Sequence, residues 1–184
     1  MEEALTVRKT SLSTFLECEL RSDHAGETGA VSIYRGIVAV ARLRRDQELI
    51  AFATQHGQTE SEHLRLIEDW LPPEHRSRLL GPWRLAGWIT GALPALFGRR
   101  AVYATIAAVE TFVDKHYQSQ IDHLNQYGGP DGLLLLLTRC QADEIHHRDE
   151  AAANAGSSLP WPLRLWCFLV GAGSAAAVVV ARRI

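Results

Sequence analysis

The stretches Glu60-Ser61-Glu62-His63 and Glu144-Ile145-His146-His147 share one pattern, a glutamate followed three positions later by a histidine. In an α-helix, residues three apart lie side by side on one face, so each stretch presents a carboxylate beside an imidazole. Both pairs continue apolar stripes with helical spacing, which contain Leu49, Ala53, His56, Ile67 and Trp70 in the first case and Leu133, Leu137, Cys140 and Ala151 in the second. The pattern predicts two helices that aim a glutamate and a histidine at the protein interior.

Two further glutamates stand alone on apolar helical stripes, each ahead of one of these pairs. Glu27 precedes Glu60 by 33 residues, and Glu110 precedes Glu144 by 34. The stripes that hold them contain Ala30, Val31, Tyr34, Val38 and Ala41 around Glu27, and Tyr103, Ala107, Val113, Tyr117, Ile121 and Leu124 around Glu110. The chain therefore contains an internal repeat of two helical hairpins, each with a lone glutamate followed by a glutamate–histidine pair.

Four carboxylates that face the interior of a bundle need positive charge beside them, because burying an unpaired ionised carboxylate is very costly. One glutamate from each of two helices, with a Glu-x-x-His pair from each of the other two, is the ligand set of ferritin-like di-iron and di-manganese bundles. Oxygen-rich ligands with two imidazoles favour iron or manganese, and no thiolate favours structural zinc. We expect an all-α, ferritin-like four-helix bundle that holds two iron ions through Glu27, Glu60, His63, Glu110, Glu144 and His147.

Breaks in the sequence place the helices of this bundle. The interruptions are a short turn at 44–46, the Pro72–Pro73 pair, the loop Gly128–Gly132 and the segment Ser157–Pro160. They predict main helices near 22–43, 47–71, 101–126 and 132–155. The chain 1–184 is expected to form a single domain, with the metal-binding bundle at 20–156, a crossover at 74–100 and a C-terminal apolar helix at 160–184.

Two segments outside the bundle helices are unusually apolar. The crossover 74–100 joins the hairpins and is rich in Trp and Leu, so it either docks on a lipid surface or forms a helix that covers the end of the bundle. From Leu165 to Ala181 no residue is charged, which is near the shortest length that spans a bilayer. This run either spans a membrane, lies on one or packs as a buried helix, and the near-neutral mean hydropathy of the chain (−0.06) favours peripheral attachment.

The composition narrows the class of protein. A net charge of −2 gives no sign of nucleic-acid binding. The cysteines Cys18, Cys140 and Cys167 form no close pair, which argues against a disulfide framework and fits buried thiols in a reducing compartment. Residues Met1–Thr10 resemble neither a secretory signal nor a transit peptide, which favours a bacterial protein.

Ligating histidines usually need a hydrogen-bond partner for the second ring nitrogen. Asp23, one turn before Glu27, is the candidate partner for His63 or His147. Asp143 is expected at the surface but is a second candidate for such a supporting role.

The other polar residues near the ligands have ordinary explanations. Histidines outside the Glu-x-x-His pairs are expected not to bind metal, and His56 is the best additional candidate because it lies on an inner stripe. Tyrosines on the inner stripes are expected to be plain core residues. The residues so interpreted are His24, His75, His123, His146, Tyr34, Tyr103 and Tyr117, with Glu62 and Asp149 expected to face solvent.

The residues around the predicted ligands resemble those of the demethoxyubiquinone monooxygenases. The stretch Arg21-Ser-Asp-His-Ala-Gly-Glu-Thr-Gly-Ala30, with Ile33–Gly36 after it, is similar to the first-helix signature of that family. The other helices are matched by Glu60-Ser-Glu-His63-Leu64, by Ala108–Glu110 with His116-Tyr117 and Gln120-Ile121, and by Asp143–His147. The resemblance extends over residues 20–184, because the Leu159-Pro160 step, the apolar helix and the Arg-rich end are also similar.

The resemblance implies a membrane-associated di-iron hydroxylase of ubiquinone biosynthesis, which uses dioxygen to add one hydroxyl group to the ring of a demethoxy polyprenyl quinone. Carried over residue by residue, it assigns iron binding to the six residues named above. Glu60 and Glu110 are the natural bridging candidates by analogy with other carboxylate-bridged sites, with the choice left open. His116 and Tyr117 fall on a family-like motif and are implied to support reductant or substrate near the metals.

Two departures from the family pattern leave substrate position and membrane attachment open. The Thr111-Phe112 pair is more apolar than expected, and the C-terminal helix is unusually rich in Ala and Val. The implied location is peripheral, on the cytoplasmic face of a bacterial inner membrane. Implied partners are the membrane surface, lipid-binding proteins and other proteins of ubiquinone biosynthesis.

Electrons must come from outside the chain, because it shows no flavin or nicotinamide fingerprint. The donor is NADH, a reductase or the reduced quinol itself. Two other functions compete with the hydroxylase: a ferritin-like ferroxidase or peroxide-scavenging di-iron protein, and a metal-free helical scaffold. The apolar C-terminal run argues against the former, and the four carboxylates on apolar stripes argue against the latter.

Overall fold

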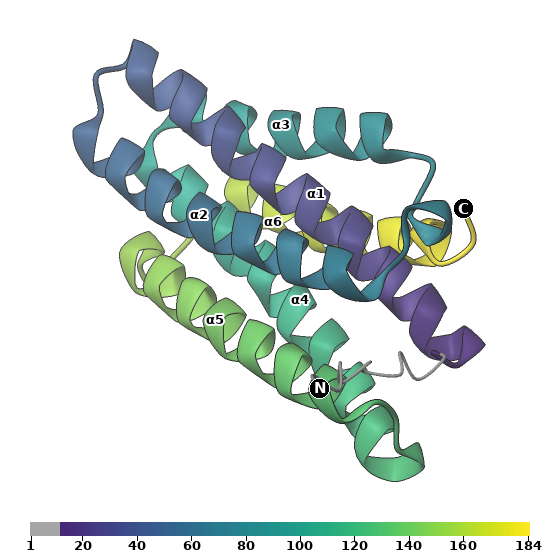
Figure 1. Cartoon of the computed structure of the whole chain (residues 1–184). Coiled ribbons are helices and arrows are strands. Elements are labelled where there is room, and N and C mark those ends of the chain that lie inside the picture. Colours follow the sequence, from purple (N-terminus) through teal and green to yellow (C-terminus); the bar gives the residue numbers. More distant parts are fainter. Residues whose placement is uncertain (1–11) are drawn as a thin grey trace, which may run out of the picture.

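A computed structural model describes residues 12–184, and over that range the regular secondary structure is entirely helical. The helices are α1 (Thr14–Leu43), α2 (Gln47–Trp70), α3 (Leu80–Phe97), α4 (Arg99–Tyr127), α5 (Asp131–Ala155) and α6 (Trp161–Ala181), with a 3-10 turn η1 at Pro73–His75. Helices α1, α2, α4 and α5 form the bundle, and α3 and α6 pack on the side of α1 and α4 (Figure 1). The all-α, ferritin-like architecture is confirmed, while the interpretation of Met1–Thr10 concerns residues outside the described range.

The first helix begins eight residues earlier than predicted. Ser13 caps α1, and its side chain accepts a hydrogen bond from the backbone N–H of Leu16 at 3.3 Å. Leu16 and Leu20 are buried against apolar residues of the other bundle helices, such as Ile67 and Leu133. This burial explains why α1 extends over them. The remaining main helices start and end within two residues of their predicted bounds.

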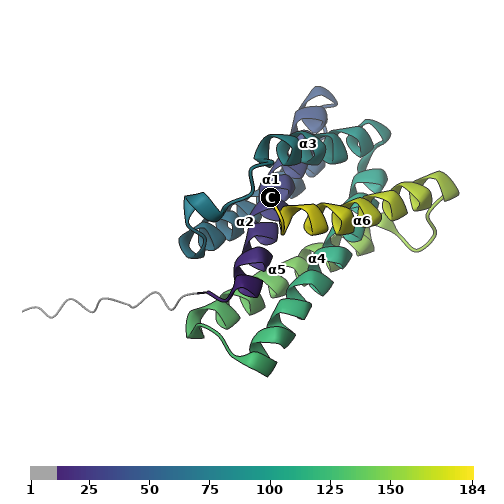
Figure 2. The same ribbon diagram turned by 90° about the vertical axis from the view of Figure 1, so that its right-hand side faces the viewer.

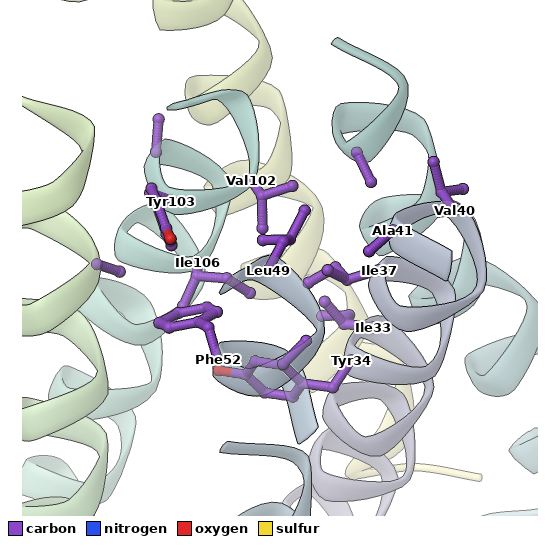
Figure 3. Close-up of a cluster of buried hydrophobic side chains, with 14 of the residues drawn as sticks. Ile33, Tyr34, Ile37, Val40, Ala41, Leu49, Phe52, Val102, Tyr103 and Ile106 are labelled. Atoms are coloured by element: carbon purple, nitrogen blue, oxygen red, sulfur yellow. The ribbon is translucent and has the colours of Figure 1, made fainter. Parts of the chain in front are cut away.

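The bundle interior contains two apolar clusters with polar residues between them. One cluster joins the end of α1 to the start of α2 and α4, and Figure 3 shows Ile37, Leu49, Val102 and Ile106 within it. The other lies toward the opposite end of the bundle and includes Leu20, Ile67, Leu133 and Leu137. The predicted ligands occupy the middle of their helices, so they lie between two dry layers of side chains.

The crossover forms α3, which lies along α1 rather than over the end of the bundle. A Cβ atom at Gly91 would lie 1.9 Å from the carbonyl oxygen of Ile33, and one at Gly87 would lie 2.2 Å from the carbonyl oxygen of Gly29. Only glycine therefore permits this approach of the two backbones. Large apolar side chains of α3 remain exposed, namely Leu85, Trp88, Ile89, Leu93, Leu96 and Phe97.

Helix α6 runs across α4 and α1, on the same side of the bundle as α3 (Figure 2). The indole Nε1 of Trp166 donates a hydrogen bond to Thr105 Oγ1 at 2.9 Å, and the side chain of Arg182 forms an ion pair with Glu19 at 2.8 Å. By length and composition, α6 is the one helix in the described range that is able to cross a membrane, with a mean hydropathy of 1.9. None of the residues in that apolar window is buried in the protein.

The three cysteines are free. Cys140 is buried as expected, whereas Cys18 and Cys167 are only half-buried. The Cys167 thiol contacts the carbonyl oxygen of Ala104 at 3.3 Å and so helps to fix α6 on α4.

Candidate metal centre

The six side chains that the sequence pattern singles out meet in the middle of the bundle. They form two groups in which one ligand atom from each residue lies within 4.8 Å of all the others. The first group is Glu27, Glu60, His63 and Glu144, and the second is Glu60, Glu110, Glu144 and His147. All six residues are buried. The structure therefore brings together four carboxylates and two imidazoles at two adjacent positions.

Glu60 and Glu144 belong to both groups, which changes the assignment of the central carboxylates. Glu60 and Glu110 were the natural bridging candidates by analogy, but Glu110 belongs to the second group alone. The internal repeat gives the reason. The repeat relates Glu60 to Glu144 and Glu27 to Glu110. Glu60 and Glu110 are therefore not equivalent positions, whereas the shared residues Glu60 and Glu144 are.

Several buried ligand atoms make no hydrogen bond of good geometry, although the carboxylates and imidazoles of the cluster lie close to one another. These atoms are Glu27 Oε2, Glu60 Oε1, Glu144 Oε2 and His147 Nδ1. Unpaired buried polar atoms are unfavourable in a folded protein unless something else satisfies them. Two metal ions would do so, because each group offers three carboxylates and one imidazole, and this oxygen-rich set suits iron or manganese. The residues present therefore fit two such ions.

Both histidines turn Nδ1 toward the carboxylates. His63 Nδ1 lies 3.1 Å from Glu144 Oε1 and 3.8 Å from Glu60 Oε2. His147 Nδ1 lies 3.0 Å from Glu60 Oε1 and 3.5 Å from Glu144 Oε2. The same ring nitrogen of each histidine thus faces the shared carboxylates, which agrees with the two-fold repeat.

Burial and the neighbouring charges shift the pKa of several ligands in this cluster. Burial, together with the charges of Glu60 and Glu144, raises the pKa of Glu27. Burial and the same two neighbours also raise the pKa of Glu110. Burial opposes protonation of His147, but the neighbouring carboxylates of Glu144 and Glu60 raise the pKa of that imidazole to about 9. A metal ion would take the place of these protons.

Asp143 supports the first histidine. Its Oδ2 lies 3.1 Å from His63 Nε2, so a carboxylate fixes the ring nitrogen that turns away from the ligands. The prediction that Asp23 has this role is wrong. Asp23 Oδ1 instead accepts hydrogen bonds from His116 Nε2 at 2.8 Å and from Gln120 Nε2 at 2.9 Å. The reason is position, because Asp23 on α1 contacts α4, whereas Asp143 on α5 contacts α2.

Two tyrosines contact the lone glutamates. The hydroxyl of Tyr117 donates to Glu27 Oε1 at 2.5 Å, and the hydroxyl of Tyr34 donates to Glu110 Oε1 at 3.4 Å. Burial raises the pKa of both phenols, so both stay neutral donors. Tyr34 was expected to be a plain core residue. The available signal was its position seven residues after Glu27, which is also the distance from Glu110 to Tyr117.

His56 lies beside the centre but belongs to neither group. Its ring centroid is 4.2 Å from that of His147, and its Nε2 contacts Glu150 Oε2 at 3.1 Å. Burial and the neighbouring His147 lower the pKa of His56 to about 4, so it packs as a neutral ring. The other histidines set aside by the sequence analysis, His24, His75, His123 and His146, are also outside both groups.

A cavity of about 390 Å³ lies beside the centre, between the bundle and the two outer helices. We call it the inner cavity. Side chains and backbone of α1, α3, α4 and α6 form its mostly apolar wall, and all four ligand glutamates reach it. His116 and Tyr117 also line it, whereas the ligand histidines lie outside its wall. A ligand in the inner cavity would therefore meet the glutamate side of the centre.

Comparison with known proteins gives one consistent result. The family model described as "Ubiquinone biosynthesis protein COQ7" matches residues 14–181. The 3-demethoxyubiquinol 3-hydroxylase of Rhodospirillum rubrum is 36% identical over 170 residues, which are 90% of this chain and 76% of that protein. The mitochondrial NADPH-dependent 3-demethoxyubiquinone 3-hydroxylase of Dictyostelium discoideum is 35% identical over 72% of this chain and 61% of its own. That of Caenorhabditis elegans is 29% identical over 95% and 93%.

Proposed function

The chain belongs to the COQ7 family of ubiquinone biosynthesis proteins, and from this premise we propose that it hydroxylates the ring of a demethoxy polyprenyl quinol with dioxygen. The observation that supports this proposal best is the inner cavity, which places an apolar chamber directly against four converging glutamates. A monooxygenase needs both parts, because its oxidant must form next to an organic substrate and away from water. We propose that the whole chain acts as one domain.

We propose that two iron ions bind in the two groups, with Glu60 and Glu144 shared between them. Glu27 and His63 would complete one position, and Glu110 and His147 the other. When bound, the iron ions supply the redox chemistry that activates dioxygen, which the side chains alone do not provide. The orphaned oxygen and nitrogen atoms of the groups support this assignment.

The protein's own residues fix the geometry around the ions. Asp143 holds the tautomer of His63 through Nε2, so that Nδ1 is free to face the centre. Tyr117 orients the carboxylate of Glu27 at the cavity wall. The apolar side chains of the inner cavity exclude water from the space where the quinol ring would lie.

His116 gives this wall a proton-holding group. Burial opposes its protonation, but the hydrogen bond from its Nε2 to Asp23 raises the pKa of the imidazole. Ser22 Oγ also lies 3.1 Å from the same nitrogen. We propose that His116 and Asp23 position an oxygen substituent of the quinol ring by hydrogen bonding, with the ring in the inner cavity.

We further propose peripheral attachment to the cytoplasmic face of a bacterial inner membrane. The exposed apolar residues of α3 and the apolar helix α6 lie on the same side of the bundle as the inner cavity, which suits a substrate that resides in lipid. Lipid-binding proteins and other proteins of ubiquinone biosynthesis remain proposed partners. The electron donor is NADH, a reductase or the quinol itself.

The experiment is a single-turnover assay under ¹⁸O₂ with iron-loaded protein and a demethoxyubiquinol. We expect a hydroxylated quinone that carries one labelled oxygen atom, detected by mass spectrometry. The control is Glu60→Ala, which lacks a shared ligand and should give no product. Oxidation of the iron without any hydroxylated quinone would contradict the proposal and favour a ferroxidase or peroxide-scavenging function.

A further inference from the structure

A second cavity, of about 420 Å³, lies next to the inner cavity where α3 ends and α6 begins. We call it the outer cavity. Its wall includes Leu93, Phe97, Ala101, Pro162, Leu163 and Trp166. Trp166 also lines the inner cavity, so the two cavities share this side chain.

The two cavities are successive parts of one groove between α3 and α6. Along α3, the residues Trp83, Gly87 and Thr90 line the inner cavity, and Leu93 and Phe97 continue the same helical stripe into the outer cavity. Along α6, Leu163 lines the outer cavity, Trp166 lines both, and Val170, Ser174, Val178 and Ala181 line the inner one. The stripe on α6 extends for about 27 Å at 1.5 Å per residue. Helices α3 and α6 run antiparallel here. The C-terminal part of α3 and the N-terminal part of α6 therefore both line the outer cavity.

The Ala181 end of this groove is polar. Arg182 forms its ion pair with Glu19, a carboxylate that is only 4% exposed, and Arg21 Nη1 donates to the carbonyl oxygen of Arg182 at 3.2 Å. Asp23 and His116 line the cavity next to this end. A hydrocarbon chain that left here would have to pass polar side chains and the ion pair of the buried Glu19, which is unfavourable for an apolar group.

The Trp166 end is apolar. The only charged residue in the wall of the outer cavity is Arg100, and backbone carbonyl oxygens of Ala155 and Ser158 accept hydrogen bonds from its guanidinium. The indole of Trp166 is held in place by Thr105, which is only 1% exposed. A chain that leaves the inner cavity toward Trp166 therefore meets mainly aliphatic and aromatic surface.

We propose that the isoprenoid chain of the substrate leaves the inner cavity along the indole of Trp166 and lies in the outer cavity, with the quinol ring at the glutamates. The inference deepens the proposed function and rests on it, because that function supplies a substrate with a ring and a long apolar chain. The direction of the chain follows from the difference between the polar Ala181 end and the apolar Trp166 end of the groove. Burial of each isoprenoid unit against the outer cavity adds affinity in proportion to the apolar area removed from water.

Photocrosslinking tests the direction of the chain without any catalytic turnover. Two ubiquinone analogues, with a diazirine on the first or on the third isoprenoid unit, are added to the metal-free protein in detergent, and labelled peptides are mapped by mass spectrometry. The first-unit probe is expected to label Trp166 and its neighbours, and the third-unit probe to label 93–101 or 160–163. Labels from the third-unit probe near Ala181 would overturn the proposal. Labels on the exposed Phe168 would also overturn it, because they would indicate diffuse contact of the chain with the apolar surface of α6.

A matched pair of variants tests the outer cavity itself. Leu163→Trp fills the cavity, whereas Leu165→Trp adds the same bulk to an exposed position on the same helix. Leu163→Trp should weaken binding of a quinone with three isoprenoid units by about tenfold, and leave a quinone without a chain unaffected. Leu165→Trp should change neither, and equal effects of both variants would contradict the proposal.

The outcomes separate this inference from the proposed function. If the probes label the outer cavity but the iron-loaded protein hydroxylates no quinol, the chain path is retained and the proposed function is overturned. If the protein hydroxylates the quinol but the third-unit probe labels other residues, the function is retained and the chain path is overturned. No specific label from either probe would contradict both.

Discussion

The two halves of the centre offer the same ligands but differ in what surrounds them. In the first half-site, Glu27 accepts a short hydrogen bond from Tyr117, and His63 Nε2 donates one to the carboxylate of Asp143. The second half-site, Glu110 with His147, has a longer hydrogen bond from a tyrosine and aromatic rings packed against its imidazole. The repeat thus reproduces the ligands, while the supporting residues give the two positions unequal rigidity.

Positions related by the repeat make the difference explicit. Tyr34 and Tyr117 each follow a lone glutamate by seven residues, and each contacts the lone glutamate of the other half. Asp143 directly precedes Glu144, whereas the equivalent residue before Glu60 is Thr59, which has no carboxylate. A metal at the first half-site should therefore be held more tightly than one at the second.

The largest effect should come from a ligand that both half-sites share. Glu60→Ala removes a carboxylate from both groups, so both ions should be lost and hydroxylation should fall by more than about 100-fold, beyond the loss typical of supporting residues. Metal analysis after gel filtration measures the stoichiometry. Glu62→Ala, two residues away and pointing to solvent, is the control and should keep both ions. A Glu60→Ala protein with both ions bound would refute the shared position.

The next effect should distinguish the half-sites. Asp143→Asn removes the carboxylate at His63 Nε2, and the affinity of the first half-site should fall by about 10- to 100-fold. Thr59→Val changes the equivalent position of the second half-site, where no carboxylate is lost. Titration with Co²⁺, followed by its visible absorption, measures both affinities. Equal losses in the two variants would show that Asp143 gives the first half-site no advantage.

Protons should compete with metal at both half-sites. The pKa of Glu27 and of Glu110 is raised by burial and by neighbouring carboxylates, and the pKa of His147 is raised to about 9. Groups with a raised pKa hold protons more tightly in the metal-free fold, so metal must displace them. Affinity should therefore increase as the pH rises toward about 9, by about tenfold per pH unit for each proton released. Calorimetry in buffers of different ionisation enthalpy counts these protons, and a count of zero would contradict the assignment.

The smallest effect should come from the tyrosines. Tyr117→Phe removes the 2.5 Å hydrogen bond to Glu27 and should weaken metal binding at the first half-site by about tenfold, the usual worth of a hydrogen bond to a charged group. Tyr34→Phe removes a contact of 3.4 Å and should have a smaller effect on the second half-site. The same Co²⁺ titration measures both. A larger loss in Tyr34→Phe would reverse the proposed order of rigidity.

Much of the fold and of the site was predictable from residue spacing. Burial of a carboxylate on an apolar stripe is so costly that the sequence alone indicates a common centre formed by Glu27, Glu60, Glu110 and Glu144. The helix bounds followed from Pro and Gly breaks, which act locally. The early start of α1 was missed because residues 14–21 carry two buried leucines among polar neighbours, and only the packing of the bundle shows that they are covered.

The supporting residues were harder to predict, because they depend on which helices face each other. Asp23 and Asp143 are both suitably spaced in sequence, and only the positions of α4 and α2 decide that Asp143 meets His63. The packing of α3 along α1 had a local signal in Gly87 and Gly91, which are four residues apart on one helical face. The groove between α3 and α6 had none, since its two walls lie far apart in the chain.

The most direct test of the central claim is the iron content per chain of the anaerobically loaded protein, combined with Mössbauer spectra recorded before and after exposure to dioxygen. The two groups predict two ferrous ions per chain in unequal sites, which dioxygen converts to a coupled ferric pair. Glu27→Ala should retain the iron of the second half-site and lose the coupling. A folded protein that binds no iron, or a single uncoupled iron, would contradict the proposed di-iron centre.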